Sequence, residues 1–523
     1  MKKRFLGLLI GACSLTLALG AFAACDNTPT GPSLQYRLDG DAYTVVGIGT
    51  YEDGELIIPD TYNGKPVTTI AALAFSGNKE IGIVEIPDSI TLIEDKAFAS
   101  CTRLESVTMG DGVTSIGKEA FAYCDSLKMI TLSDSLTKID DKAFYYCRKL
   151  QAISFPDTLE VIGKSAFEGK SDREVHNNLT TVNFGTGLRS IGEKAFYNCA
   201  NLLDVIIPDG APTTIGKGAF LNCRGVRVVD LGDNVLSIGE SAFSADEFQE
   251  GGHLCLREVI IGDKVHTIGA QAFQNCRKLS SVTLGKGVQT IGENAFYKCQ
   301  VLREVINESN LTISVGSDAH GCVAQNAWDV RLAGEKSKIS YDEQGLVYYN
   351  EGSNKILISV ILEDSTDIVI PDDVTEIAKY ACYAEDFLTG VVIGNGCTKV
   401  GSKAFGNCYN MRTLKLGNAL TTIDDYAFYN NVALYSVVFG PSVKTVGEGA
   451  FLKKDGWDGF RTYRIYFLGT KAQWDAIDFV EVKNEHLLDP GKGGKIGFYS
   501  ENEPTDTNNL YWRYVNGFPK YWE

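Results

Sequence analysis

The sequence lacks the short motifs that mark the common catalytic sites. It has only five histidines in 523 residues and no H-E-x-x-H motif of a zinc protease. It also lacks the G-x-S-x-G nucleophile elbow, the EF-hand calcium loop and a G-x-G-x-x-G segment between a strand and a helix. Gly163-Lys-Ser165 resembles the end of a phosphate-binding loop, but Thr158 stands where that loop needs glycine. These absences predict a protein that is not an enzyme and needs no cofactor or metal ion.

Positive charge is also scarce. Lysine and arginine number 49 against 66 aspartate and glutamate residues, so the formal net charge is −17. A chain this acidic is repelled by the phosphates of nucleic acids and by anionic membrane surfaces, so neither is an expected partner. The charge indicates solubility in a crowded exterior, and attraction to a basic partner is the alternative.

Long apolar runs are missing except at the N-terminus. Met1–Arg4 is basic and Phe5–Ala23 is apolar, which is the pattern of a targeting segment. Small residues stand directly before Cys25, as in a bacterial lipobox, although Phe22 replaces the usual leucine. We expect removal of residues 1–24 and lipid attachment at Cys25, with an ordinary cleaved signal peptide as the alternative. Both interpretations predict export, and lipid attachment at Cys25 would anchor the protein at the outer face of the bacterial cell membrane. No other stretch approaches the ~20 apolar residues of a membrane span.

One dipeptide, Ala-Phe, recurs along the chain, and most copies are 23 residues apart. Its phenylalanines are Phe75, Phe98, Phe121, Phe144, Phe167, Phe196, Phe220, Phe243, Phe273, Phe296, Phe405, Phe428 and Phe451. Ala319-His320 and Ala381-Cys382 resemble two degenerate copies, which would make fifteen. A period in this range predicts a repeat solenoid, in which each repeat contacts only its neighbours.

Each repeat contains two short alternating segments and one compact turn. Around Val107 the alternation of apolar and polar residues predicts a half-buried strand, which Gly110 ends. A second short strand is expected near Ile116, followed by a 3₁₀ or short helical turn that carries Ala-Phe. A single repeat has too few apolar side chains to form a core, so stacking must bury them. Parallel rungs ~4.8 Å apart would give fifteen repeats a length on the order of 70 Å.

The repeated I-G-x-x-A-F-x-x-C pattern, as in Ile116–Cys124, resembles the BspA-like leucine-rich repeat family of bacterial surface proteins. The resemblance covers about residues 67–330 and 371–455. It implies a leucine-rich repeat solenoid that is rich in β-structure, with a parallel strand ladder and a cap at each end. It also implies an extracytoplasmic location and, as in some members, adhesion or binding.

Most of the fourteen cysteines follow the Ala-Phe turn. Nine lie at or near the third residue after the phenylalanine: Cys101, Cys124, Cys147, Cys199, Cys223, Cys276, Cys299, Cys322 and Cys408. Asn78 and Asn431 occupy the same slot elsewhere, which indicates an inward position for a small side chain that bonds to the backbone. The parallel Cβ vectors of stacked rungs suit disulfides poorly. The sequence contains no C-x₂-C pair of the kind that would suggest a metal site. We expect buried thiols, with some disulfides as the alternative.

Three extensions lengthen the repeat, each between the Ala-Phe turn and the next strand: Glu168–Asn177, Ser244–His253 and Leu452–Arg461. They should project from one edge of the solenoid, where insertions often form a binding face. The candidate binding residues within them are Arg173, His176, Phe248, His253, Trp457 and Phe460. Exposed aromatic residues commonly anchor partners. The alternatives are tolerated surface variation and, for Trp457 and Phe460, packing against a C-terminal cap.

The largest interruption of the repeat separates two blocks. Ile339–Tyr349 and Lys355–Ile361 are predicted as two strands joined by a hairpin turn. The predicted organisation is a signal peptide (1–24), a tether (25–33), an N-terminal cap (34–66), a first repeat block (67–330), a hairpin spacer (331–370), a second repeat block (371–455) and a C-terminal cap (456–523).

These features together predict a cell-surface binding or adhesion protein. Its partner would be an extracellular host or bacterial protein, or a glycan, held by many weak contacts along an extended surface and a loop edge. The chain is expected to be a monomer that touches the membrane only through its lipid. The alternatives are a passive structural lipoprotein of the envelope and carbohydrate binding by the aromatic C-terminal region.

Overall fold

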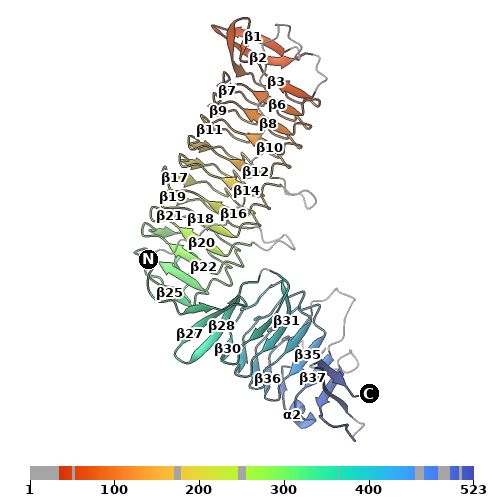
Figure 1. Ribbon diagram of the computed structural model, residues 1–523. Coiled ribbons are helices and arrows are strands. Elements are labelled where there is room, and N and C mark those ends of the chain that lie inside the picture. Colours follow the sequence, from red (N-terminus) through yellow and green to blue (C-terminus); the bar gives the residue numbers. More distant parts are fainter. Residues whose placement is uncertain are drawn as a thin grey trace.

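The computed structural model describes residues 34–49, 54–169, 178–245, 255–362, 364–453, 464–480, 495–505, 509–516 and 518–522. The chain is an elongated stack of rungs that bends between β25 (Asp329–Arg331) and β27 (Leu346–Glu351) (Figure 1). Each side of the bend has its own hydrophobic core, from Val45 to Ala327 and from Ile339 to Phe498. The molecule therefore consists of two stacked blocks that meet at an angle.

The second, shorter strand of each repeat forms one continuous ladder in the first block. Its strands pair in parallel wherever they belong to repeats, because consecutive rungs repeat the same short apolar pattern. In order they are β1 (Leu34–Asp39), β2 (Ala42–Ile48), β5 (Lys65–Ile70), β7 (Leu92–Ile93), β9 (Ser115–Ile116), β11 (Lys138–Ile139), β13 (Val161–Ile162), β15 (Ser190–Ile191), β17 (Thr213–Ile215), β19 (Val235–Ile238), β21 (Thr267–Ile268) and β23 (Thr290–Ile291), with β4 (Thr61–Tyr62) beside β5.

The first strand of each repeat lies on the opposite side of the rung, in an outer ladder that is divided into three sheets. The first sheet contains β3 (Glu55–Ile57), β6 (Ile83–Ile86), β8 (Ser106–Met109) and β10 (Met129–Thr131). The second contains β12 (Ala152–Ser154) and β14 (Thr181–Asn183). The third contains β16 (Asp204–Ile206), β18 (Val228–Asp230), β20 (Glu258–Ile261), β22 (Ser281–Leu284), β24 (Glu304–Asn307) and β25.

The Ala-Phe phenylalanines form a column of stacked rings inside each block. From Phe75 to Phe296, neighbouring ring centroids are 4.9 to 5.3 Å apart and their planes are nearly parallel. Phe405, Phe428 and Phe451 repeat this arrangement in the second block. This spacing matches that of hydrogen-bonded strands, so one register fixes both the ladders and the column. The 23-residue period thus produces the predicted solenoid.

Backbone hydrogen bonds within the rung and to the next rung hold the Ala-Phe turn in place. The Ala120 N–H donates to the Gly117 oxygen, and the Phe121 N–H donates to Ala143 in the following rung. The i to i+3 bonds are those of a 3₁₀ turn, as expected. However, Glu119 and Tyr123 have φ values of 55° and 60°, so the segment is a succession of turns with left-handed residues rather than a regular helix.

The repeat register differs from the prediction at Ala319-His320. The Phe296 N–H donates to Gly321, so Gly321 takes the position of the repeated alanine. This region forms α1 (Ala319–Cys322), whose His320 and Gly321 have positive φ. Ala381-Cys382 does fit the pattern, because the buried Cys382 donates its N–H to Ala404.

The cysteines form a column beside the phenylalanines. Eight of the nine predicted positions donate the thiol to a carbonyl of the preceding rung at 3.0 to 3.5 Å: Cys101, Cys124, Cys147, Cys199, Cys223, Cys276, Cys299 and Cys408. Cys322 is the exception and is only partly buried, because the register shifts in its rung. No disulfide joins any two of the twelve cysteines that the structure describes.

The spacer contains three antiparallel strands where the sequence predicted two. A turn at Asp342–Gly345 divides the expected first strand into β26 (Ile339–Tyr341) and β27, and β28 (Asn354–Val360) follows. Gly345 permits this turn because its φ is 78°. β28 then pairs in parallel with the first rung of the second block.

The second block repeats the two ladders of the first. Its inner ladder continues from β28 through β30 (Glu376–Ile377), β32 (Lys399–Val400), β34 (Thr422–Ile423), β36 (Thr445–Val446) and β38 (Asp478–Phe479). Its outer ladder contains β29 (Thr366–Ile370), β31 (Leu388–Ile393), β33 (Thr413–Lys415), β35 (Ser436–Phe439), β37 (Arg464–Phe467), β39 (Lys495–Tyr499), β40 (Leu510–Val515) and β41 (Phe518–Tyr521).

Aromatic residues close the C-terminal end. In α2 (Lys471–Asp475), Trp474 packs edge-on against Phe439 and Phe467. Trp512 is fully buried and its indole N–H donates to the Phe467 oxygen at 3.1 Å. These two tryptophans are engaged in the core, so neither offers a free ring to a sugar.

Candidate binding edge

All six candidate binding residues lie outside the described residues: Arg173, His176, Phe248, His253, Trp457 and Phe460. The same holds for Cys25, the expected site of lipid attachment. Their roles therefore stay predictions. The flanks of the three extensions are described, and these flanks define the edge of the solenoid from which each extension leaves.

All three extensions interrupt the same part of the rung. At the first extension, the chain leaves the turn of Phe167 at Gly169, whose N–H donates to the Tyr197 oxygen. It returns at Asn178, whose N–H donates to the Arg148 oxygen. Equivalent flanks border the second and third extensions, from Ala245 to Cys255 and from Lys453 to Arg464. Each extension lies between an Ala-Phe turn and the following strand of the outer ladder. We call this side of the solenoid the turn edge.

Three tyrosines gather on the turn edge next to the first extension. Tyr145 and Tyr146 stack with ring centroids 3.9 Å apart, and Tyr123 packs edge-on against both at 5.5 Å. The Tyr146 N–H donates to Glu168, the residue that begins the extension. Partial burial raises the pKa of Tyr123 and of Tyr145, so both hydroxyls remain neutral donors at physiological pH. We call these three residues the tyrosine cluster.

Lysines lie beside tyrosines on the turn edge, both in the tyrosine cluster and in other rungs. The ammonium groups lie over tyrosine rings at 5.1 Å for Lys142–Tyr145 and 5.4 Å for Lys194–Tyr197 and Lys298–Tyr297. The tyrosine in each pair offers a flat apolar face and a hydroxyl donor, and tyrosine is enriched in protein recognition surfaces. The sequence signal for this edge was available and was missed: a tyrosine repeatedly stands one or two residues after the Ala-Phe phenylalanine.

The first block meets the second through two arginines in identical local sequences. Leu-Arg-Glu-Val-Ile occurs at 256–260 and at 302–306. Arg303 is buried and donates to the Ile358 oxygen at 2.8 Å and the Lys379 oxygen at 3.1 Å. Arg257 donates to the Leu362 oxygen at 3.2 Å. Burial lowers the pKa of Arg303 to about 10. Because this value is still well above neutral pH, the guanidinium keeps its charge.

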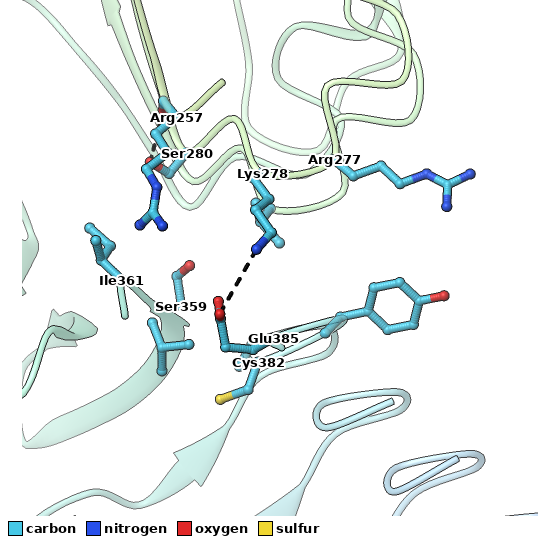
Figure 2. Close-up of a pocket in the computed structure, with 12 residues that line it drawn as sticks. Arg257, Arg277, Lys278, Ser280, Ser359, Ile361, Cys382 and Glu385 are labelled. Carbon is cyan, nitrogen blue, oxygen red and sulfur yellow. Dashed lines mark hydrogen bonds and ion pairs between the residues drawn. The ribbon is translucent and has the colours of Figure 1, made fainter. Parts of the chain in front are cut away.

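A narrow cleft lies beside these arginines (Figure 2). Lys278 of the first block points toward Glu385 of the second, with 3.8 Å between ammonium and carboxylate. Burial raises the pKa of the Glu385 carboxyl. Arg277 points away from this pair. The space open to water is about 30 Å³, which suits one or two water molecules rather than a ligand. The cleft is therefore part of the joint between the blocks.

The described part of the chain offers no group of three or more His, Cys, Asp or Glu side chains arranged to hold a metal ion. Within the same residues, no helix has the length and apolar character needed to cross a membrane.

Stacked rungs with two strands each, an inner phenylalanine column and a regular 23-residue period define a leucine-rich repeat solenoid. The family model described as BspA type leucine rich repeat region matches residues 68–176, 173–250, 248–322 and 363–456. The chain belongs to this family, as the sequence pattern predicted.

Solved structures of bacterial leucine-rich repeat proteins resemble this chain. One from Bacteroides ovatus shares 19% identity, with 87% of this chain and 99% of that chain covered and a TM-score of 0.43. One from T. pallidum shares 27% identity over 37% of this chain and 87% of its own, with a TM-score of 0.33. A leucine rich cell surface protein from Faecalibacterium prausnitzii shares 20% identity, with 87% and 98% covered and a TM-score of 0.31. No curated protein gives a significant match.

Proposed function

We propose that this chain is a surface-exposed binding protein that recognises an extracellular protein or glycan through its turn edge. The observation that carries the proposal is the position of the tyrosine cluster directly beside the first extension. Tyrosines provide apolar contact area and a hydroxyl at low entropic cost, and extensions supply contacts that differ from rung to rung. An adhesive role would use many such weak contacts along the rod.

The proposed location is the outer face of the bacterial cell membrane, with the chain anchored through a lipid on Cys25. The leader pattern of residues 1–24 supports export. The resembling protein from Faecalibacterium prausnitzii is described as a cell surface protein, which agrees with the same placement.

The experiment measures binding of the full-length protein to arrays of extracellular-matrix proteins and of glycans. We expect at least one binder, and we expect its affinity to fall by about tenfold or more when residues 170–177 are deleted or Tyr146 is replaced by serine. Tyr341→Ser is the matched control, because Tyr341 is 59% exposed but lies on the spacer. Unchanged binding of the turn-edge variants, or equal loss in the control, would contradict the proposal.

A further inference from the structure

The outer ladder of the first block has a gap between β10 and β12. No backbone hydrogen bond joins Met129–Thr131 to Ala152–Ser154 among the described residues, although β10 pairs with β8 and β12 pairs with β14. Behind the gap the two rungs stay joined, because β11 pairs with β13. The gap is therefore a slot that opens on the outer face and is closed by the inner ladder.

The slot reaches the apolar interior of the solenoid. Its volume is about 440 Å³, and Ile130, Leu132, Ile153 and Phe155 supply its apolar lining. The Ile130 side chain faces the core like those of its neighbours, yet it is partly exposed, whereas Ile153 is only 2% exposed. A hollow of this size with an apolar lining can take a large apolar side chain.

The walls of the slot can bond to an extended chain. Strands that lack a neighbour present backbone N–H and C=O groups, which are the groups that pair with an added peptide strand. The hydroxyl-bearing residues Thr131 and Ser154 also line the slot. The gap is narrower than a full strand position, because the two rungs beside it remain stacked, with 5.1 Å between the ring centroids of Phe144 and Phe167. It therefore favours insertion of a side chain, with the peptide backbone lying along the rim.

One end of the slot is acidic. Asp134 and Asp157 follow β10 and β12 by three residues each, and Asp111 occupies the same position in the preceding rung. All three are exposed, and none forms an ion pair with a described residue. Asp157 accepts from the Thr186 N–H at 2.8 Å and Asp111 from the Asp134 N–H at 3.5 Å. Because none of the three carboxylates has a cationic partner among the described residues, they favour a cationic side chain at this end.

We propose that the slot binds an extended polypeptide segment, with a large apolar side chain over Ile130 and a lysine or arginine beside Asp134 and Asp157. This inference rests on the proposed function and names the chemistry of a partner segment at a second place on the molecule, away from the turn edge. The partner segment would thus combine one aromatic or large aliphatic residue with a base about four residues further on, since residues at this spacing share a face of a strand.

Methionine methyl NMR on the full-length protein tests this directly. Met129 is 66% exposed in β10 beside the slot, whereas Met109 and Met411 are buried and act as internal references. The probe is the peptide acetyl-Thr-Phe-Thr-Thr-Thr-Arg-Thr-amide. We expect it to shift the Met129 methyl signal and leave that of Met411 unchanged. Replacing the peptide's phenylalanine by alanine should weaken binding about tenfold or more, and replacing its arginine by glutamate should also weaken it.

Two protein variants fill the slot from its exposed rim: Ala152→Trp and Ser154→Trp. Either should abolish the Met129 shift in a protein whose thermal unfolding is unchanged. Ser281→Trp is the matched control, because Ser281 lies on the unbroken part of the outer ladder in β22. The proposal is overturned if the Phe-Arg peptide leaves Met129 unmoved at millimolar concentration, or if it binds the slot variants as well as the control. Array binding that persists through the turn edge in that case would show that the proposed function stands without the slot.

Discussion

At the residue scale, the cysteine column shows how a repeated side chain serves the fold rather than a chemical site. Each of its thiols donates to a carbonyl one rung away. The Phe98 and Phe121 carbonyls also accept a backbone N–H from their own rung, so the thiol supplies a second bond to a buried acceptor. Asn431 occupies the same position of the repeat. Its amide oxygen accepts from the Cys408 backbone N–H, but its buried amide nitrogen has no hydrogen-bond partner. This position of the repeat thus accepts different small polar side chains and favours the thiol.

Burial of these thiols predicts a loss of stability at alkaline pH. Burial raises the pKa of Cys101 to about 12, so the folded thiol stays neutral where the unfolded thiol ionises. Stability is fully present below the pKa of the unfolded thiol and falls as pH rises above about 9, by up to about 1.4 kcal/mol per pH unit for each such thiol. Urea unfolding at pH 7.5 and pH 9.5 should show a lower midpoint at the higher pH.

Alkylation gives an independent check of the same burial. Iodoacetamide at pH 8 should modify the partly buried Cys255 and Cys322 well before Cys101, Cys124 or Cys147 in the native protein. Rapid labelling of the column in folded protein would contradict the described packing.

At the element scale, the rung depends on residues that can adopt unusual backbone angles. Gly345 is the clearest case, because its φ is 78° and an added Cβ would lie 2.2 Å from the Ile361 oxygen. We expect Gly345→Ala to lower the free energy of unfolding by about 2 kcal/mol or more. Gly352→Ala is the control, since Gly352 has a φ of 62° but no atom within 4 Å of the added group. A smaller loss in the control, measured by urea unfolding, would isolate the steric contact from the backbone strain.

The gap in the outer ladder should also appear in hydrogen exchange. The Thr180 N–H in the next rung donates to Gln151 at 2.8 Å, whereas no such bond links the Gln151 N–H to the rung before it. Exchange follows local opening, so amides around β12 should exchange faster than those around β14. Equal protection of the two segments would mean that the ladder closes in solution.

At the scale of the whole molecule, the angle between the blocks depends on a few polar contacts and on Trp328, which packs against Tyr349 of the second core. The two blocks have separate cores, and Arg257, Lys278 and Arg303 join them. Truncating a buried arginine leaves the carbonyls that it served without a donor. The angle between the blocks should therefore be sensitive to single substitutions in the joint, while each block keeps its own fold.

Arg303→Met tests the joint. We expect a larger radius of gyration by small-angle scattering and a second, separate transition in calorimetry, because the blocks no longer unfold together. Arg412→Met is the control, since Arg412 stands at the same repeat position in the second block and is exposed. An unchanged scattering profile for Arg303→Met would show that the spacer alone sets the angle.

The sequence predicted the repeated parts of this structure well and its exceptions poorly. Ala-Phe spacing indicated the phenylalanine column, and the cysteine slot indicated inward thiols bonded to backbone. The turn at Gly345 was missed although the polar run Asp342–Gly345 interrupts the apolar pattern of Ile339–Tyr349. The tyrosines of the turn edge were visible in the sequence but were hidden among the residues that vary between repeats. The candidate residues within the extensions stay predictions.

By itself, the sequence determined the solenoid, its family and the interior of each rung, because these depend on contacts that recur at a fixed separation along the chain. Only the tertiary structure decided the angle between the blocks and the slot in the outer ladder. Arg303 contacts Ile358 and Lys379 far along the chain, and the gap beside Ile130 arises where two neighbouring strands fail to pair. Neither feature recurs with the 23-residue period, although the outer ladder also breaks between β14 and β16. No period in the sequence therefore reports these features, and each is set by how the rungs pack against one another.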